Sequence, residues 1–374
     1  MIREAGSAGL YIHIPFCKSK CVYCDFCSSP ASEAVKKEYV SALSADLKSK
    51  TRDTRQITTV YVGGGTPSCL ADGEIIRILE TVKGKIADGA EITVEVNPES
   101  FTPSKAEEYK NAGVNRISIG VQSLDDGILA RLGRLHDSAQ AVAAVKLASR
   151  YFDRVSCDLI IGIDGQTGQG LKNEISVLTS AGAGHISCYA LKVEEGTKLA
   201  AMVAEGYKLP DDDRISDLYD VIYDTLKGYG YQRYEVSNFA LPGQYSRHNY
   251  SYWTGVPYIG VGVSAHGFTG RERYGNLCDV GQYIEAVKAG KSTVSETVKL
   301  CDEDLEAERI MLALRTERGL NVPEFNRRFK TDFYGKYSRA IMTSGEAVCS
   351  DGNYFRIRPE YFYVMNSIII EFLP

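Results

Sequence analysis

Short runs rich in β-branched and apolar residues alternate with longer amphipathic stretches along the first half of this 374-residue chain. The runs have the length and composition of buried strands, and they cover residues 10–14, 58–62, 92–96, 116–121, 155–162 and 185–191. The stretches between them space their apolar residues as helices do, at 33–50, 72–87, 103–112, 138–150 and 170–181. Six parallel strands joined by crossover helices are therefore predicted.

The number of these units limits how the sheet can close. Parallel strands need helices on their faces, and a closed barrel of this type needs eight units, two more than the chain offers before residue 200. The predicted fold class is therefore α/β, with an open partial (β/α)6 barrel. Ligands of such folds bind beyond the carboxyl ends of the strands, so the loops after the strands are the place to look for chemistry.

The pattern changes after Gly196, and a different architecture is predicted there. A helix at 211–229 is followed by two or three short strands within 233–263 and then by helices interrupted by Gly and Pro. The tail is predicted to hold helices at 303–316, 322–329 and 333–345, a short hairpin near 351–358 and a closing helix. This order resembles a small winged-helix module, interpreted here as a packing unit.

Three domains are predicted from these changes. They are a barrel core at 1–200, an α+β extension at 201–300 and a winged-helix-like domain at 301–374.

Composition narrows the class of protein. The chain is 44% hydrophobic and 24% charged, which is typical of a globular protein, and its net charge of -5 gives no reason to expect nucleic acid as a partner. The first residues do not resemble a signal peptide, and the apolar run 364–373 falls short of the roughly 20 residues of a membrane span. A cytoplasmic location is expected.

Ten cysteines in such a chain favour metal or redox chemistry over a disulfide framework. Cys17, Cys21, Cys24 and Cys27 lie within eleven residues. The other six, interpreted as ordinary small apolar residues, are Cys69, Cys157, Cys188, Cys278, Cys301 and Cys349.

The first three cysteines form a CxxxCxxC triplet directly after the first predicted strand and Pro15. Thiolates select iron–sulfur clusters or zinc, but a structural zinc site normally has four ligands, and a zinc knuckle is the alternative reading. Three thiolates on a four-iron cube leave one iron open for a chelating cosubstrate. S-adenosylmethionine can fill that position with its amino nitrogen and carboxylate, and an electron from the cluster then cleaves its sulfonium C–S bond to give a 5′-deoxyadenosyl radical.

The triplet, with Tyr23 before its last cysteine, resembles the radical S-adenosylmethionine superfamily. Further stretches are similar to the oxygen-independent coproporphyrinogen III oxidases and their relatives, the heme chaperones. In chain order these stretches are YIHIPFCKSKCVYCDF, GGGTPS, NRISIGVQS, LGRLHD, YEVSNFA and HNYSYW.

The resemblance implies a [4Fe-4S] cluster on Cys17, Cys21 and Cys24. It also implies an S-adenosylmethionine site, in which Gly64, Gly65 and Thr66 receive the amino group and Glu95 binds the ribose. The other positions implied at or near this site are Tyr11, Tyr23, Gln122, Arg134 and Asp158. Taken alone, the glycine turn is typical of structure, and each buried polar group could equally pair with another side chain.

The stretch HNYSYW contains the only Trp and one of the five His residues, which suits a flat aromatic ligand. A single His is more often structural, but the HNxxYW pattern resembles that of the chaperone branch, where it is associated with heme. His248 is therefore predicted to bind heme, and His248→Ala is expected to weaken heme binding with an intact cluster.

Two features of this chain differ from the oxidase branch of the family. The oxidase branch carries a further Cys two residues after the third ligand and an amino-terminal extension, whereas this chain has Phe26 at that position and its first strand begins by residue 10. Both favour a heme chaperone that lacks coproporphyrinogen III dehydrogenase activity. The implied partners are a heme or porphyrin ligand, a client hemoprotein such as a membrane-associated respiratory one, and a reductant such as flavodoxin or ferredoxin.

Two alternatives stay open. One is a decarboxylating oxidase that acts on coproporphyrinogen III. The other is a ferredoxin-like electron carrier, which would require Cys27 as a fourth cluster ligand, whereas the favoured interpretation of Cys27 is a loop thiol.

Overall fold

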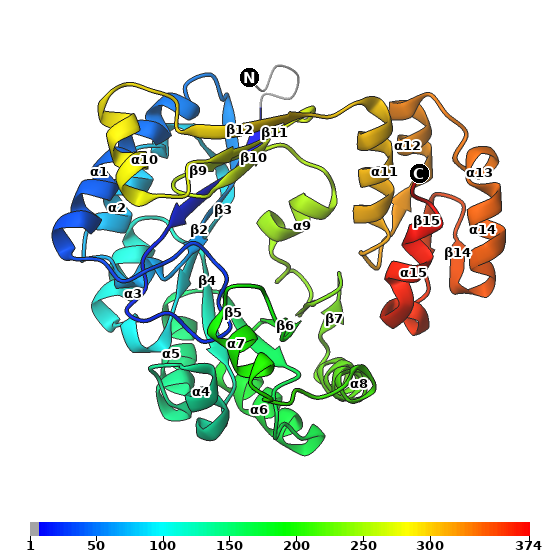
Figure 1. Cartoon of the computed structure of the whole chain (residues 1–374), viewed down its shortest axis with the longest axis horizontal. Helices are drawn as coiled ribbons and strands as arrows, with labels where there is room; N and C mark the ends of the chain where they lie inside the picture. Colours follow the sequence, from blue (N-terminus) through cyan, green and yellow to red (C-terminus); the bar gives the residue numbers. More distant parts are fainter. Residues whose placement is uncertain (1–6) are drawn as a thin grey trace.

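The computed structural model describes residues 7–374 and is built on six parallel strands, as predicted (Figure 1). These strands are β1 (Ser7–Ile14), β2 (Gln56–Gly64), β3 (Ile86–Val96), β4 (Arg116–Gln122), β5 (Arg154–Ile161) and β6 (His185–Ala190). Each pairs in parallel with the next one along the chain. The α/β class is therefore confirmed, and the loops that follow these strands leave the sheet at one edge.

Helices connect the strands and cover the outer face of the sheet (Figure 1). They are α1 (Glu33–Lys50), α2 (Glu74–Glu80), α3 (Pro103–Asn111), α4 (Asp126–Leu132), α5 (Ser138–Tyr151) and α6 (Gly168–Ala181). Side chains start several of them: Ser32 accepts a hydrogen bond from the Val35 amide, and Asp137 forms a reciprocal capping pair with Gln140. The short helix α4 was not predicted.

The sheet is twice as wide as the predicted barrel. Its twelve strands run in the order β12-β11-β10-β9-β1-β2-β3-β4-β5-β6-β8-β7, so β12 and β7 are the open edges. The added strands are β7 (Gln232–Arg233), β8 (Asn238–Ala240), β9 (Tyr258–Val261), β10 (His266–Phe268), β11 (Glu272–Asn276) and β12 (Val294–Lys299). Strand β9 pairs in parallel with β1, so the extension continues the barrel sheet at its first strand.

Three helices precede or accompany this widening, namely α7 (Lys198–Ala204), α8 (Asp212–Gly228) and α9 (Arg247–Trp253). The prediction of helices between residue 263 and residue 300 is wrong for most of that stretch, because β10, β11 and β12 occupy it and only α10 (Val280–Lys288) is helical. The three-residue β10 is too short to show the alternation of apolar and polar residues that marks a strand. Its place in the sheet depends on hydrogen bonds to neighbouring strands, not on its own sequence pattern.

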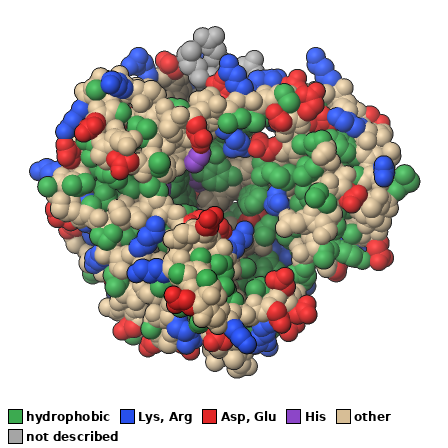
Figure 2. All heavy atoms as spheres, viewed as in Figure 1, with side chains coloured by type: hydrophobic (Ala, Val, Ile, Leu, Met, Phe, Trp, Pro, Cys, Tyr) green, Lys and Arg blue, Asp and Glu red, His purple; other side chains and the backbone are tan. Residues whose placement is uncertain are grey.

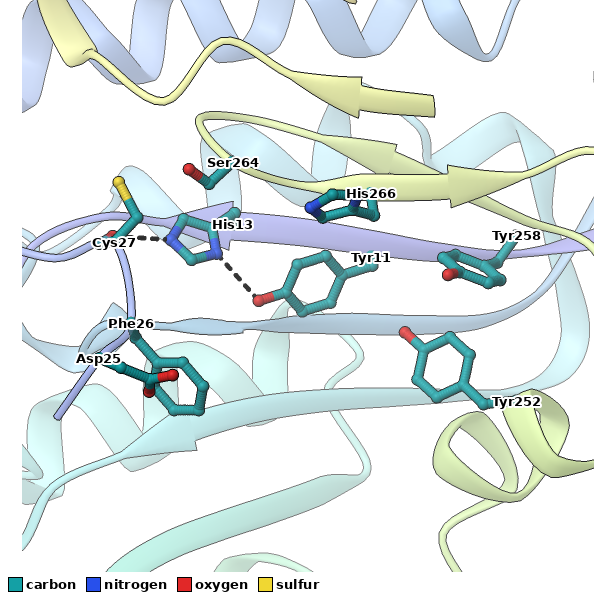
Figure 3. A pocket seen from close by; sticks show the side chains of 9 residues that line it. All are labelled: Tyr11, His13, Asp25, Phe26, Cys27, Tyr252, Tyr258, Ser264 and His266. Carbon is teal, nitrogen blue, oxygen red and sulfur yellow. Dashed lines mark hydrogen bonds between the residues drawn. The ribbon is translucent and has the colours of Figure 1, made fainter. Parts of the chain in front are cut away.

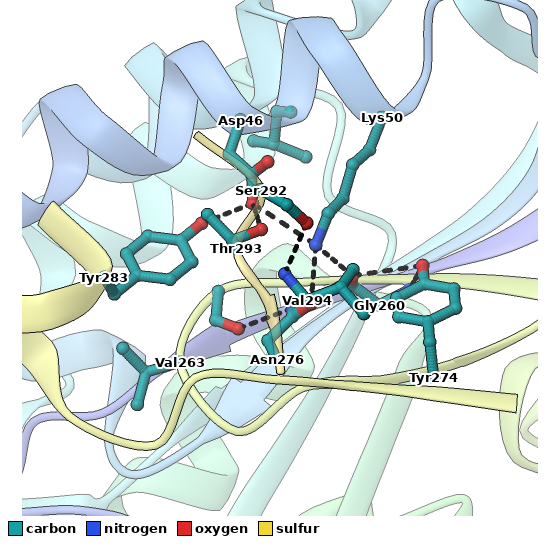
Figure 4. Close-up of polar contacts among 12 residues, drawn as sticks. Asp46, Lys50, Gly260, Val263, Tyr274, Asn276, Tyr283, Ser292, Thr293 and Val294 are labelled. Atoms are coloured by element: carbon teal, nitrogen blue, oxygen red, sulfur yellow. Dashed lines mark hydrogen bonds and ion pairs between the residues drawn. The ribbon is translucent and has the colours of Figure 1, made fainter. Parts of the chain in front are cut away.

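A buried polar network fastens this extension to α1 (Figure 4). The Asp46 carboxylate accepts hydrogen bonds from the Tyr283 hydroxyl at 2.7 Å and the Thr293 hydroxyl at 3.1 Å, and it lies 3.4 Å from Lys50 Nζ. Lys50 also donates to Asn276 Oδ1 at 2.6 Å. One helix of the barrel is thereby joined to α10, β11 and the segment before β12.

The C-terminal part has its own apolar cluster. It holds α11 (Asp302–Ala313), α12 (Val322–Phe329), α13 (Phe333–Lys336), α14 (Ser338–Ser344), α15 (Met365–Ile370) and the strands β13 (Leu320–Asn321), β14 (Val348–Ser350) and β15 (Tyr354–Ile357). The strands form a separate sheet in the order β13-β15-β14. Phe325, Phe333, Phe355 and Phe372 meet in the centre of this cluster. The likeness to a winged helix and the three-domain division stay predictions.

Figure 2 shows the molecule hollowed in the middle of one face, with hydrophobic side chains around the hollow. Across residues 7–374, none of the helices combines the length and apolar character needed to cross a membrane.

Candidate functional site

The three cysteines of the triplet lie on the loop that follows β1. Their thiols are half-buried and line one cavity of about 640 Å³. Backbone hydrogen bonds hold the loop in place, since the Val22 amide donates to the Leu132 carbonyl at 3.2 Å and the Cys24 amide to the Cys21 carbonyl at 3.3 Å. The loop is therefore anchored to the end of α4, and its thiols face the same space.

The thiols do not converge as ligands of a single ion. Within residues 7–374, no three Cys, His, Asp or Glu side chains come together in a way that could hold one metal ion. A four-iron cube makes a different demand, because each thiolate binds its own iron.

Cys27 is separate from this set. It is not among the residues that line the cavity, and its thiol donates to the Cys278 carbonyl at 3.2 Å. The electron-carrier alternative needs Cys27 beside the other three thiols, so this placement does not support it.

Two predicted residues contact the cysteines directly. The Thr66 hydroxyl donates to Cys17 Sγ at 3.3 Å, and Arg134 Nη1 donates to Cys21 Sγ at 3.4 Å. Asn97 links the two, because its Nδ2 donates to Thr66 Oγ1 at 3.1 Å and its Oδ1 accepts from Arg134 Nη2 at 2.8 Å. Hydrogen bonds of this kind favour the ionised thiolate that binds iron.

Asn97 was not predicted. It directly follows the third predicted strand, so its place at a strand's carboxyl end was the available signal. Tyr61, whose hydroxyl donates to Glu95 at 2.6 Å, was also missed, because nothing in the sequence marks that contact.

Arg134 retains a free donor. Its Nε is buried, and no acceptor for it is present in the described part of the chain. A buried donor without a partner costs about 1–3 kcal/mol, so a ligand oxygen that accepts from it would be stabilised. The guanidinium therefore suits a carboxylate in the cavity.

The glycine turn after β2 packs against the cysteine loop. The Gly65 amide donates to the Ile14 carbonyl at 2.9 Å, and a Cβ at Gly65 would lie 2.7 Å from the Phe16 carbonyl oxygen. Gly64 has a φ of 105°, which a residue with a Cβ rarely adopts. The glycines therefore allow two loops to meet while both line the cavity.

Two carboxylates form part of the wall. Burial raises the pKa of Glu95 to about 7, although hydrogen bonds from the Tyr61 hydroxyl and the Gly64 amide favour its charged form. Burial likewise raises the pKa of Asp158 to about 6, opposed by hydrogen bonds from Ser187 and Ser118. Both are acceptors that could receive ligand hydroxyl or amino groups.

Gln122 ends β4 with a φ of 68°, an uncommon value for a residue other than glycine. Such strain is often kept where a side chain must point at a ligand. Gln122 lines the same cavity as the cysteines.

Eleven of the predicted site residues line this one cavity. They are Cys17, Cys21, Tyr23, Cys24, Gly64, Gly65, Thr66, Glu95, Gln122, Arg134 and Asp158. Their roles in binding stay predictions. Tyr11 is not brought into the cavity, and it lies in a neighbouring one, where its hydroxyl meets His13 Nδ1 at 2.9 Å.

His248 is also elsewhere, near the start of α9. It is fully buried, and its ring nitrogens meet the Thr59 hydroxyl and the Tyr252 hydroxyl, each at 2.8 Å. Its ring stacks on Tyr61 with 5.2 Å between centroids. Burial lowers the pKa of His248 to about 3, which keeps the imidazole neutral. The hydrogen bonds to Thr59 and Tyr252 occupy both ring nitrogens, so neither is free to bind a metal.

Comparisons with known proteins agree with the family resemblance that was drawn from the sequence motifs. Residues 11–177 match the model of the radical SAM superfamily. The chain is 32% identical to the heme chaperone HemW of Lactococcus lactis, over 100% of this chain and 98% of the relative. It is 36% identical to HemW of Mycobacterium tuberculosis, over 83% of this chain and 82% of the relative. It is 39% identical to HemW of Escherichia coli, over 69% of this chain and 69% of the relative.

The fold has a counterpart of known structure. Coproporphyrinogen III oxidase (HemN) of Escherichia coli, a radical SAM enzyme, superposes with a TM-score of 0.87 over 99% of this chain and 91% of that chain. At 19% identity, this likeness concerns the fold alone. The similarity to HemW extends over the full length, and the chain belongs to the radical SAM superfamily and, within it, to the HemW family.

Proposed function

We propose that this chain is a cytoplasmic heme chaperone that holds a [4Fe-4S] cluster on Cys17, Cys21 and Cys24 and binds S-adenosylmethionine at the remaining iron. The observation that carries the proposal is that three thiols, without the neighbouring Cys27, line one cavity together with the residues predicted for the cosubstrate. Relatives similar over most of their length are named heme chaperones, which supports heme as the cargo.

The residues around the thiols suit both groups. Thr66 and Arg134 donate to two of the sulfur atoms and would stabilise them as thiolates. The unpaired Arg134 Nε suits the carboxylate of S-adenosylmethionine, and Glu95 could accept from its ribose hydroxyls. When bound, the cluster supplies an electron that can cleave the sulfonium.

Phe26 makes coproporphyrinogen III oxidase the less favoured of the two functions. It stands where the oxidase branch carries a further cysteine, and it is 61% exposed and lines the cavity. A phenyl ring neither binds iron nor transfers a proton, so whatever that cysteine contributes is absent here. Delivery to a client hemoprotein, with flavodoxin or ferredoxin as reductant, completes the proposal.

The test is a side-by-side assay of the anaerobically reconstituted protein. Hemin titration followed by absorbance measures binding, and anaerobic incubation with coproporphyrinogen III and S-adenosylmethionine measures decarboxylation. We expect saturable hemin binding, transfer of heme to an apo-hemoprotein and no vinyl products. Formation of vinyl products would instead support the oxidase, and absence of hemin binding would refute the chaperone.

A further inference from the structure

A second cavity, of about 420 Å³, lies beside the cysteine loop (Figure 3). Its wall combines adjacent strands with α9 and the loop: Tyr11 comes from β1, Tyr258 from β9, His266 from β10 and Tyr252 from α9. The volume is within the range of small-ligand sites, and the lining is mainly aromatic. Flat aromatic ligands stack on such side chains.

The two cavities share part of their wall. Asp25 and Phe26, which directly follow Cys24, line both of them. A ligand in the second cavity would therefore contact the segment that carries the last predicted cluster ligand.

Among residues 7–374, which include every histidine of the sequence, only one histidine is available to a ligand from solvent. His13, His136, His185 and His248 are all buried, and each has a ring nitrogen in a hydrogen bond. His266 is the exposed one, and none of the hydrogen bonds of residues 7–374 involves its ring. A Cβ at Gly275, opposite it on β11, would come within 3.1 Å of His266 Cε1, so the glycine gives the ring room.

The other candidate ligands in this cavity are engaged. His13 Nε2 meets the Cys27 carbonyl at 3.1 Å while its Nδ1 meets Tyr11, and the Cys27 thiol donates to Cys278. Burial raises the pKa of the Tyr252 and Tyr258 hydroxyl groups, which keeps the phenols protonated. Imidazole is a common axial ligand of heme iron.

We infer that this second cavity is the cargo site of the chaperone and that His266 is the axial ligand of the heme iron. The inference rests on the proposed function, which supplies heme as the cargo. Tyr11, Tyr252 and Tyr258 offer rings against the porphyrin, and the exposed position of His266 leaves one edge of the heme in solvent, as transfer to a client requires.

His248 acts in this arrangement as a positioning residue. Its Nε2 holds the Tyr252 hydroxyl, and Tyr252 is one turn further along α9, with its ring 4.7 Å from the Tyr258 ring between centroids. The HNxxYW stretch thus reaches the cavity through its tyrosine, and its histidine sets where that tyrosine stands.

Hemin titration of the full-length, anaerobically reconstituted variants tests the inference, with absorption and electron paramagnetic resonance spectra of the bound heme as the ligand signature. We expect His266→Ala to weaken hemin binding by about tenfold or more and to abolish the histidine signature. His266→Tyr, which replaces one iron ligand by another, is expected to regain affinity with a phenolate-type spectrum. His248→Ala should lower affinity while the spectrum stays unchanged, and Cys27→Ser, which removes the cysteine of the same cavity, should leave the spectrum unchanged.

Retention of both affinity and spectrum by His266→Ala would overturn the inference while hemin binding by the parent protein still supports the chaperone. A spectrum altered by Cys27→Ser or His248→Ala instead of His266→Ala would assign the ligand to that residue and also overturn it. Iron content of each variant shows whether the cluster and the fold are retained. Absence of hemin binding in the parent protein would refute the proposed function itself. Failure of the proposed function is thereby distinguished from failure of the His266 assignment.

Discussion

Arg134 donates a hydrogen bond from Nη1 to Cys21 Sγ at 3.4 Å, while its Nη2 donates to Asn97 Oδ1 at 2.8 Å. One guanidinium thus contacts a predicted cluster ligand and the side chain that positions Thr66. Its third donor group, Nε, is the buried one without a partner among residues 7–374. Arg134 is therefore placed to join the cluster and its cosubstrate.

Arg134→Gln is expected to weaken S-adenosylmethionine binding by about 10- to 100-fold, because charge-assisted hydrogen bonds of about 1.5–3 kcal/mol are lost. Iron and sulfide content should change little, since all three cysteines remain. Anaerobic calorimetric titration of the reconstituted protein measures the affinity. Arg131→Gln, an exposed arginine on α4, is the matched control and should bind normally. Equal affinities of the two variants would remove Arg134 from the site.

Replacement of Cys17, Cys21 or Cys24 by Ser is expected to remove most of the iron and sulfide after reconstitution, because each change deletes one of only three ligands. Cys27→Ser should regain as much iron and sulfide on reconstitution as the parent chain, because the Cys27 thiol donates a hydrogen bond to the Cys278 carbonyl. Chemical analysis of iron and sulfide distinguishes the variants. Loss of the cluster in Cys27→Ser would mean that Cys27 is a ligand and that no iron is left open.

Glu95 makes the stability of the metal-free protein depend on pH. Its folded pKa of about 7 exceeds the value of about 4.3 for an unfolded glutamate, so the folded state holds the proton more tightly. The stability that this proton contributes is fully present below about pH 4.3 and is lost as the pH rises through about 7.

Glu95→Gln lacks this titration. Relative to the parent chain, its free energy of unfolding is expected to rise by about 2 kcal/mol between pH 5 and pH 8. Urea unfolding of the two proteins at both pH values gives the difference directly. If the difference stays constant with pH, the folded pKa of Glu95 is not raised.

Asp46→Ala should destabilise the protein by about 3 kcal/mol, because Lys50 and two hydroxyl groups would lose a buried partner. Asp46 is only 7% exposed, and its hydrogen bonds join α1 to α10 and to the segment before β12. The midpoint of urea unfolding measures the change. Asp53→Ala, an exposed aspartate just beyond α1, should leave that midpoint within error. A small effect at Asp46 would show that the network does not fasten the extension.

The barrel strands and their helices could be predicted because their information is local. Residues 33–50 read as a helix, and α1 spans Glu33–Lys50, since Ser32 supplies a cap and apolar residues recur at helical spacing. Strand β10 could not be found in the same way. It has three residues, and its neighbour β9 is fixed by pairing with β1, which lies about 250 residues earlier along the chain.

The residues of the candidate site show the same difference between local and long-range information. Glu95, Gln122 and Asp158 were implied by the family resemblance, and they line one cavity because polar residues in or after parallel strands gather at one edge of a sheet. His248 could be recognised as part of a motif, but its burial could not be predicted. Its ring partners Thr59 and Tyr61 lie on β2, and the bond to Thr59 spans 189 residues of sequence.

Strand β1 is paired on both sides, with β2 on one edge and with Tyr258–Val261 on the other. While the chain is being synthesised, the second edge stays bare until those four residues have emerged from the ribosome. A bare edge invites pairing with other chains, so a nascent chain of this protein is exposed to aggregation at the strand that leads into Cys17. Iron and sulfide supplied after release of the finished polypeptide would meet a loop whose supporting strand is already enclosed.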